Sequence, residues 1–117
     1  MASLGIVADE GAPMTSRNRL PNRRHAENFE FQLEGLHYTA TVGRFPDGTI
    51  GELFLQNYKS SSSADTAARD SAIVLSIALQ HGADLGTIQR ALCRDSHGQA
   101  SGPLGAVLDI IMGSTTP

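Results

Sequence analysis

The chain has 117 residues, of which 40% are apolar and 18% charged, and its net charge is −3. This length fits one domain with a modest core, and the composition excludes a fibrous or wholly disordered chain. The longest apolar run, residues 72–79, is much shorter than the roughly 20 residues needed to cross a bilayer, which excludes a membrane span. Cys93 is the only cysteine and the N-terminus lacks the features of a secretory signal, so we expect a cytoplasmic protein without disulfides.

Residues 1–27 form a predicted N-terminal arm. They mix Gly, Pro, Ser, Asn and Arg without a sustained apolar period, so we expect a mobile segment. Four of the nine basic residues lie there within eight positions: Arg17, Arg19, Arg23 and Arg24. From Glu27 onward ten acidic residues oppose five basic ones, which argues against a broad nucleic-acid-binding face on the domain. The arm itself could bind a nucleic acid or an acidic partner surface, and the alternative is a solvated tail.

Three predicted strands follow the arm. Apolar and polar residues alternate over residues 29–33 and, after Gly35, again over residues 36–42. Residues 45–48, Phe-Pro-Asp-Gly, supply the fixed φ of proline and a glycine that tolerates positive φ, as a hairpin loop requires. Extended character returns over residues 50–56. We therefore expect a three-stranded antiparallel β-meander.

The first predicted helix begins after a run of four serines. Ser62 or Ser63 can accept a backbone N–H at the helix start, and Asp65 lies near the positive end of the helix dipole. The helix runs to about His81, because Gly82 offers the left-handed conformation that ends many helices. Its later half is apolar on nearly every side, so we expect it to be the central core helix.

Two shorter helices are predicted next. Asp84 is the N-cap of the first, with Arg90 and Arg94 facing outward near its end. The second opens at residues 102–103, Gly-Pro, since proline at the first helical position loses no hydrogen bond, and it ends at Gly113. It carries an apolar stripe at helical spacing: Leu104, Val107, Leu108 and Ile111.

The serine run is also a candidate ligand site. Lys59, Ser61, Ser62 and Ser63 precede a helix N-terminus, where hydroxyls, backbone N–H groups and the helix dipole can together bind phosphate. The segment lacks the glycines of a P-loop, and the alternative is a hydrophilic connector that only caps its helix. These four residues are the predicted phosphate-binding or ligand-binding site.

The sequence contains no recognisable catalytic or metal-binding constellation. Cys93, Asp95 and His97 alternate along the chain, but no second cysteine and no His pair at i, i+4 supports a metal site. Cys93 is expected to be semi-buried in the second helix. The four histidines fall on separate predicted elements and are expected to be exposed: His25, His37, His81 and His97. We therefore predict no metal, no cofactor and no nucleophile, and expect that the chain is not an enzyme.

A resemblance to a known family covers residues 17–110. The strings that carry it are Arg19-Leu20-Pro21, Tyr38-Thr39-Ala40-Thr41-Val42-Gly43, Asp47-Gly48, Gly51-Glu52-Leu53-Phe54-Leu55 and Leu75-Ser76-Ile77-Ala78-Leu79-Gln80-His81-Gly82. Together they resemble a TSCPD domain, which lies near the C-terminus of the large subunit of many ribonucleotide reductases, notably the vitamin B12-dependent ones. Where that family reads Thr-Ser-Cys-Pro-Asp, this sequence reads Ala100-Ser101-Gly102-Pro103-Leu104.

The resemblance implies a role linked to the reductases without their reaction. Ribonucleotide reduction needs a thiyl-forming cysteine, a redox cysteine pair and a large barrel, whereas this chain has only Cys93 and has Gly102 at the family's cysteine position. We expect a stand-alone accessory module that binds a protein or a nucleotide in deoxyribonucleotide metabolism. The alternative, from the residues, is a nucleic-acid-associated protein that uses residues 17–25.

The sequence thus predicts an α+β fold, a three-stranded antiparallel meander packed against a long helix and two shorter ones. The domain is expected over residues 28–113, between the arm at 1–27 and a tail at 114–117. So small a sheet leaves edges and apolar surface to cover, so we expect a homodimer or docking onto another protein, for which a ribonucleotide reductase subunit is a candidate. No membrane partner is expected.

Overall fold

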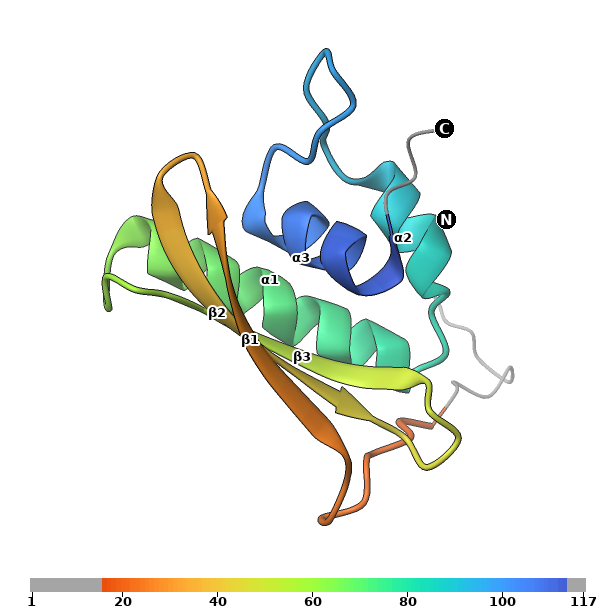
Figure 1. Ribbon diagram of the computed structural model, residues 1–117. Coiled ribbons are helices and arrows are strands. Elements are labelled where there is room, and N and C mark those ends of the chain that lie inside the picture. The colour runs from red at the N-terminus through yellow and green to blue at the C-terminus, as the bar shows by residue number, and fades with distance from the viewer. Residues whose placement is uncertain (1–15, 114–117) are drawn as a thin grey trace, which may run out of the picture.

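The computed structural model describes residues 16–113, so residues 1–15 of the predicted arm and the predicted tail at 114–117 lie outside the described part. The elements are β1 (Ala26–Leu33), β2 (Leu36–Arg44), β3 (Ile50–Asn57), α1 (Ser63–Gln80), α2 (Leu85–Ala91) and α3 (Pro103–Met112). The strands form one antiparallel sheet in the order β1-β2-β3 (Figure 1). The predicted α+β fold and β-meander are confirmed.

Local sequence accounts for both hairpins. Leu33 pairs with Leu36, so Glu34 and Gly35 form a two-residue loop, and both have positive φ, 51° and 80°. Positive φ at both positions is the type I′ geometry that matches the right-handed twist of the strands. In the second hairpin Gly48 has a φ of 90°, which is the conformation expected from the Asp-Gly pair.

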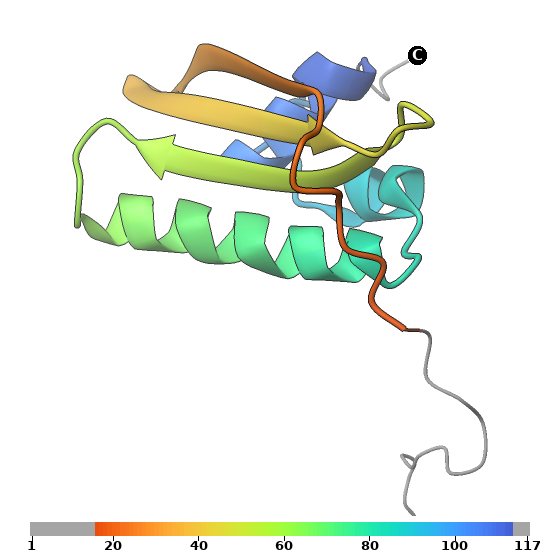
Figure 2. The ribbon, with the colours of Figure 1, turned by 90° about the horizontal axis from the view of Figure 1, so that it is seen from below.

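The long helix α1 closes the free edge of β3 (Figure 2). It runs alongside β3 in the opposite direction, on the side away from β2. Ser76 Oγ accepts the Leu53 N–H at 2.8 Å and lies 3.0 Å from the Leu53 carbonyl oxygen, while Gln80 Nε2 donates to the Gly51 carbonyl at 2.9 Å. Unpaired backbone groups on an edge strand invite association with other strands. Polar side chains of α1 satisfy them here, so one of the two edges that the sequence left open is covered.

The hydrophobic core lies between the sheet and the helices. Ala68 and Ala72 are almost wholly buried, and their small side chains allow α1 to approach β3 closely. The α3 helix packs against β1 and α1 on the face of the sheet that bears the core. The buried apolar side chains come from all three strands, α1 and α3: Phe31, Tyr38, Ala40, Val42, Leu53, Leu55, Ala68, Ala72, Leu75, Leu79, Val107 and Leu108.

The long helix α1 packs on the core as expected, but one side of its apolar later half is exposed. Ile73, Val74 and Ile77 are 50%, 67% and 41% exposed. The reason is that α1 lies at the end of the sheet, where β3 and α3 contact one side of the helix and no other element within residues 16–113 covers its opposite side. Apolar residues on all sides of a helix therefore indicate complete burial only if other elements pack on every side of it.

The short helices largely follow the predictions. Asp84 Oδ2 accepts the Thr87 N–H at 2.9 Å, which confirms the N-cap of α2. Arg94 does not face outward, because its NH1 and NH2 donate to the two oxygens of Asp109 on α3 at 2.7 and 2.8 Å. This ion pair holds the pKa of Asp109 below its usual value. The sequence does not reveal the pair, because its members belong to different elements.

None of the helices within residues 16–113 combines the length and the apolarity that crossing a membrane would require.

Candidate functional site

Residues 16–25, which contain all four arginines of the predicted arm, cross one end of the sheet (Figure 2). Two of these arginines bond the segment to the rest of the fold. Arg17 Nε donates to Gln80 Oε1 at 2.6 Å, and Arg24 Nε pairs with Glu52 Oε2 at 2.5 Å. Gly43 faces Glu52 across the sheet, and any Cβ at this position would collide with the Glu52 side chain. The segment is therefore anchored at both ends, while the mobility expected of the whole arm stays a prediction.

A cavity of about 300 Å³, which we call the basic cavity, opens where this segment meets the β2–β3 hairpin. Four basic side chains line it: Arg23, Arg24, His25 and Arg44. Glu52 and Glu27 neutralise Arg24 and Arg44 at 2.5 and 3.1 Å. The other two basic side chains make no hydrogen bond to any residue between 16 and 113. They give the cavity donors that an anion could use.

Phe45 forms an apolar wall of the basic cavity. Its ring lies over Gly51, where an added Cβ would come within 2.6 Å of Phe45 Cε2 and 2.9 Å of Leu20 Cδ1. A neighbouring hollow of about 600 Å³ shares Phe45 and Pro21 with the basic cavity and is also lined by Arg19. An aromatic ring beside cationic donors suits a ligand that combines a flat ring with an anionic group.

The predicted serine site is occupied by a carboxylate of the protein itself. Ser62 Oγ accepts the Asp65 N–H at 3.1 Å, which confirms Ser62 as the N-cap, and Ser63 is the first residue of α1. Ser61 has a φ of 65° and donates its N–H to Asp65 Oδ2 at 3.1 Å, while Lys59 is exposed. A phosphate would have to displace Asp65 to reach these donors. Ligand binding there stays a prediction.

Asp65 links the serine loop, β3 and α1. Its Oδ1 accepts the Asn57 N–H at 2.9 Å, and its Oδ2 also accepts Arg69 Nε at 3.0 Å. The side chain is 4% exposed, yet the hydrogen bonds, that from Asn57 first, hold the pKa of Asp65 below its usual value. Asp65 is thus ionised at neutral pH and fixes the start of α1 against the end of β3.

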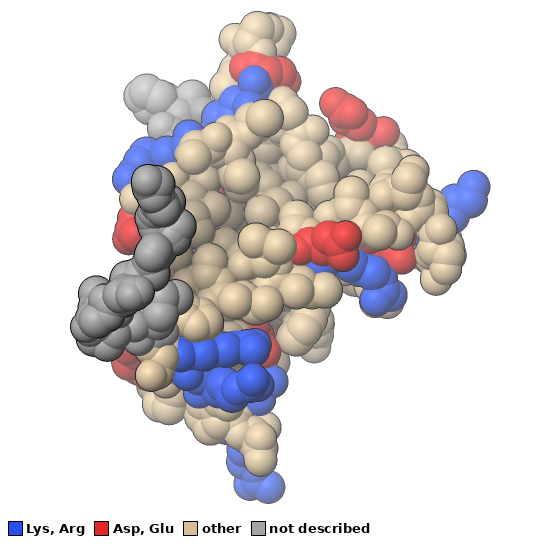
Figure 3. All heavy atoms as spheres, turned by 180° about the vertical axis from the view of Figure 1, so that it is seen from behind, with Lys and Arg blue, Asp and Glu red and all other residues tan. Residues whose placement is uncertain are grey.

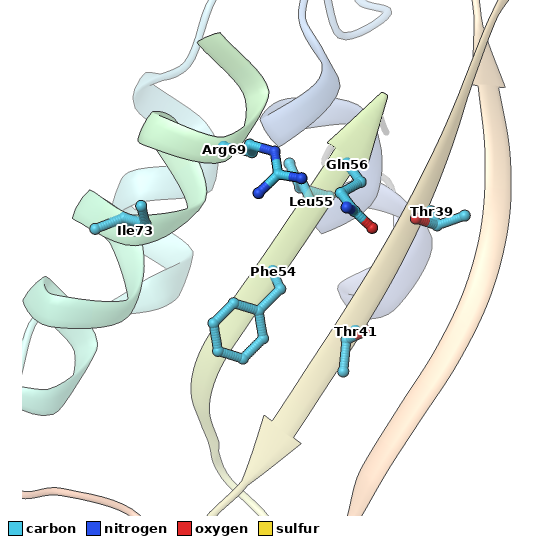
Figure 4. A pocket seen from close by; sticks show the side chains of 7 residues that line it. All are labelled: Thr39, Thr41, Phe54, Leu55, Gln56, Arg69 and Ile73. Atoms are coloured by element: carbon cyan, nitrogen blue, oxygen red, sulfur yellow. The ribbon is translucent and has the colours of Figure 1, made fainter. Parts of the chain in front are cut away.

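A groove of about 390 Å³ lies between α1 and the uncovered face of the sheet (Figure 4). In the figure the guanidinium of Arg69 points toward Gln56, and the ring of Phe54 stands nearer the start of β3. Phe54 and Ile73 are each 50% exposed. The sequence gives no signal for this groove, because its walls come from β2, β3 and α1: Thr39, Thr41, Phe54, Leu55, Gln56, Arg69 and Ile73.

Cys93, Asp95 and His97 lie in the loop between α2 and α3. Within residues 16–113 no group of three or more His, Cys, Asp or Glu side chains could hold a metal ion. Asp95 Oδ1 instead accepts the backbone N–H groups of His97 and Gln99 at 2.8 and 3.0 Å. The expectation that Cys93 is semi-buried in the second helix is wrong, because α2 ends at Ala91 and the thiol is exposed. All four histidines are exposed, as predicted.

Gly102 is the N-cap of α3. A Cβ at this position would meet no atom within 4 Å, so packing does not impose the departure from the cysteine of the TSCPD pattern. Cys93 lies close to this position in the fold, since its carbonyl accepts the Ser101 N–H at 3.0 Å.

The sequence identified only part of the basic cavity. Arg23 and Arg24 were predicted as binding residues, whereas His25 was expected only to be exposed and Phe45 only to form a hairpin loop. Arg44 gave no signal at all. The strand register and the path of residues 16–25 bring these side chains together, and neither is encoded in local spacing.

Two curated proteins are similar to this chain. It is 33% identical over 69 residues to a vitamin B12-dependent ribonucleotide reductase of Agrobacterium fabrum and 35% identical over 72 residues to one of Rhodopirellula baltica. The matches cover 59% and 62% of this chain but only 5% and 7% of the reductases. No family model and no solved structure matches the chain. The chain therefore contains a domain related to a small part of vitamin B12-dependent ribonucleotide reductases.

Proposed function

We propose that the chain is a non-catalytic binding module of deoxyribonucleotide metabolism and that it binds a nucleotide at the basic cavity. The observation that carries this proposal is the convergence of Arg23, Arg24, His25 and Arg44 on one cavity beside Phe45. The names of the similar proteins direct the choice of ligand to ribonucleotides and their products.

The resemblance to TSCPD domains supports the same assignment. Two of the strings that carry it meet at this end of the fold, since Leu20 lies against Gly51 and Glu52 holds Arg24. Gly102 at the family's cysteine position supports a role that does not use a thiol. We therefore assign the domain to binding and not to the reductase reaction.

The proposed binding mode uses each wall of the basic cavity for one part of the nucleotide. Arg23 and His25 donate hydrogen bonds to the phosphate groups, because they make none to residues 16–113 and a guanidinium can bind a phosphate with two parallel bonds. The base packs on the ring of Phe45, as flat rings do on aromatic side chains. Arg24 and Arg44 remain paired with their glutamates and keep the cavity in shape.

Calorimetric titration of the full chain with ribo- and deoxyribonucleoside triphosphates tests the proposal. Saturable binding is expected, and Arg23→Gln should weaken it roughly tenfold or more, because a hydrogen bond between charged groups is lost. Arg90→Gln is the matched control, since Arg90 is an exposed arginine on α2, away from the basic cavity, and its loss should leave the affinity unchanged. Absence of saturable binding, or equal binding by both variants, would overturn the proposal.

The same titration separates the nucleotide from the nucleic-acid alternative. Single-stranded oligonucleotides should bind no more tightly than a mononucleotide if the basic cavity recognises one nucleotide. Affinity that rises with oligonucleotide length and falls steeply with salt would instead favour nucleic-acid binding by the arm. The pairing of Arg17 with Gln80 and of Arg24 with Glu52 leaves fewer arginines of the arm for such contacts.

A further inference from the structure

The solvent side of α1 carries a seam of residues at the spacing of a coiled coil. Asp70, Val74, Ile77 and His81 follow one another at intervals of four, three and four, which places them on one side of a helix. All four are exposed, and the two central ones are apolar. Figure 3 looks onto the side of the molecule that bears α1, where a broad area of uncharged side chains surrounds an acidic and a basic group near the middle. This seam belongs to the side of α1 that no other element within residues 16–113 covers.

The seam is a ridge with a hollow on each side. On one side lies the groove of Figure 4, bordered by Ile73 and Phe54. On the other side is an apolar hollow of about 520 Å³ between α1, α2 and the start of α3. Its lining includes Asp70 and Val74 of the seam and the apolar side chains of Ile88, Leu92 and Leu104. A two-fold axis across the seam places the same apolar surface of two copies face to face.

We propose that two copies of the chain associate through this seam, with their α1 helices antiparallel about a two-fold axis between Leu75 and Ser76. In that register Val74 lies opposite the partner's Ile77. Asp70 then faces the partner's His81, and the symmetry repeats this contact at the other end. The apolar centre is covered and each end joins an acidic to a basic group, so the surface complements itself.

Charge complementarity selects a second copy as the occupant. The Nδ1 atom of His81 lies 3.0 Å from the Ile77 carbonyl oxygen, which leaves Nε2 as the ring atom that can bind a carboxylate. The register that places Val74 opposite the partner's Ile77 also places the Asp70 carboxylate opposite the imidazole of the partner's His81. An unrelated protein would have to supply the same apolar and charged pattern independently, whereas a two-fold axis supplies it from one helix.

Sedimentation equilibrium of the full chain tests the association. A dimer, twice the chain mass of 12.4 kDa, is expected. Ile77→Asp should raise the dimer dissociation constant at least about thirtyfold, because a centrally buried apolar contact is replaced by a charge. Ile110→Asp is the matched control, since Ile110 on α3 is 55% exposed and lines neither hollow. A monomer at every concentration, or equal loss in both variants, would overturn the proposal.

A charge exchange tests the antiparallel register. Asp70→Lys should weaken the dimer severalfold, because the carboxylate that faces the partner's His81 imidazole at each end is replaced by an ammonium group that cannot accept its hydrogen bond. The double variant Asp70→Lys, His81→Asp exchanges the two charges and should restore the affinity. Restoration is specific to self-association, since no other partner would carry the compensating change. Failure of the double variant to recover, with the thermal unfolding midpoint unchanged, would exclude this register.

Discussion

Single polar residues of α1 join the helix to the sheet by hydrogen bonds to the backbone of β3. Asp65 was predicted only as an acidic residue near the helix dipole, yet it also accepts backbone N–H groups from β3 and from the serine loop. Ser76 interrupts the apolar run of α1, and it binds the backbone of Leu53 at the edge of β3. At the residue scale, the polar interruptions of an apolar helix mark the places where backbone groups of another element need partners.

Replacement of Ser76 tests this role. Ser76→Ala should lower the free energy of unfolding by about 1–3 kcal/mol, because the Leu53 N–H would be buried without its partner. Ser71→Ala is the control, since Ser71 Oγ bonds to the Ala68 carbonyl of the same helix and to no other residue between 16 and 113, and its effect should stay within about 0.5 kcal/mol. Urea denaturation measures both values, and equal effects would contradict the role of Ser76 at the strand edge.

At the scale of elements, the segment that precedes β1 and the start of β3 depend on each other. Leu20 and Phe45 both lie over Gly51, and the absence of a Cβ there permits this approach. Arg17, near the start of the same segment, donates a hydrogen bond to Gln80 at the end of α1. The basic cavity exists only while this segment is held against the sheet, so its anchoring is a condition of the proposed binding.

A methyl group at position 51 tests the anchoring. Gly51→Ala should displace Phe45 and Leu20, lower the free energy of unfolding by about 1–3 kcal/mol and speed tryptic cleavage within residues 17–24. Limited proteolysis with mass spectrometry reads the cleavage rate. Gly102→Ala, where the added Cβ meets no atom within 4 Å, should leave that rate unchanged. Cleavage that is equally fast in the wild-type chain would show that the segment is not held.

At the scale of the whole molecule, carboxylates set the response to acid. Hydrogen bonds lower the pKa of five aspartates: Asp47, Asp65, Asp84, Asp95 and Asp109. For Asp65 the largest cause is the Asn57 N–H, and for Asp109 it is the Arg94 guanidinium. Since each pKa is lower in the folded state, these groups stabilise the fold fully above the ordinary carboxyl pKa of about 3.9.

Stability should therefore fall as the pH decreases below about 4, where the unfolded chain takes up protons before the folded one, and the loss continues until the folded pKa values are passed. Asp65→Asn should flatten this dependence, because one of the contributing carboxylates is removed. Urea denaturation at several pH values from about 5 to 2 provides the measurement. An identical pH dependence for Asp65→Asn and the wild-type chain would show that Asp65 does not contribute.

The sequence by itself determined the elements of this protein. Alternation of polar and apolar residues located the strands, and Ser62, Asp84 and Gly113 marked helix ends, because these signals act between residues close together in the chain. Only the tertiary structure decided where the surfaces lie. It exposed Val74 and Ile77 on an apparently buried helix and joined residues 23–25 to Arg44, because burial and convergence depend on which elements pack together.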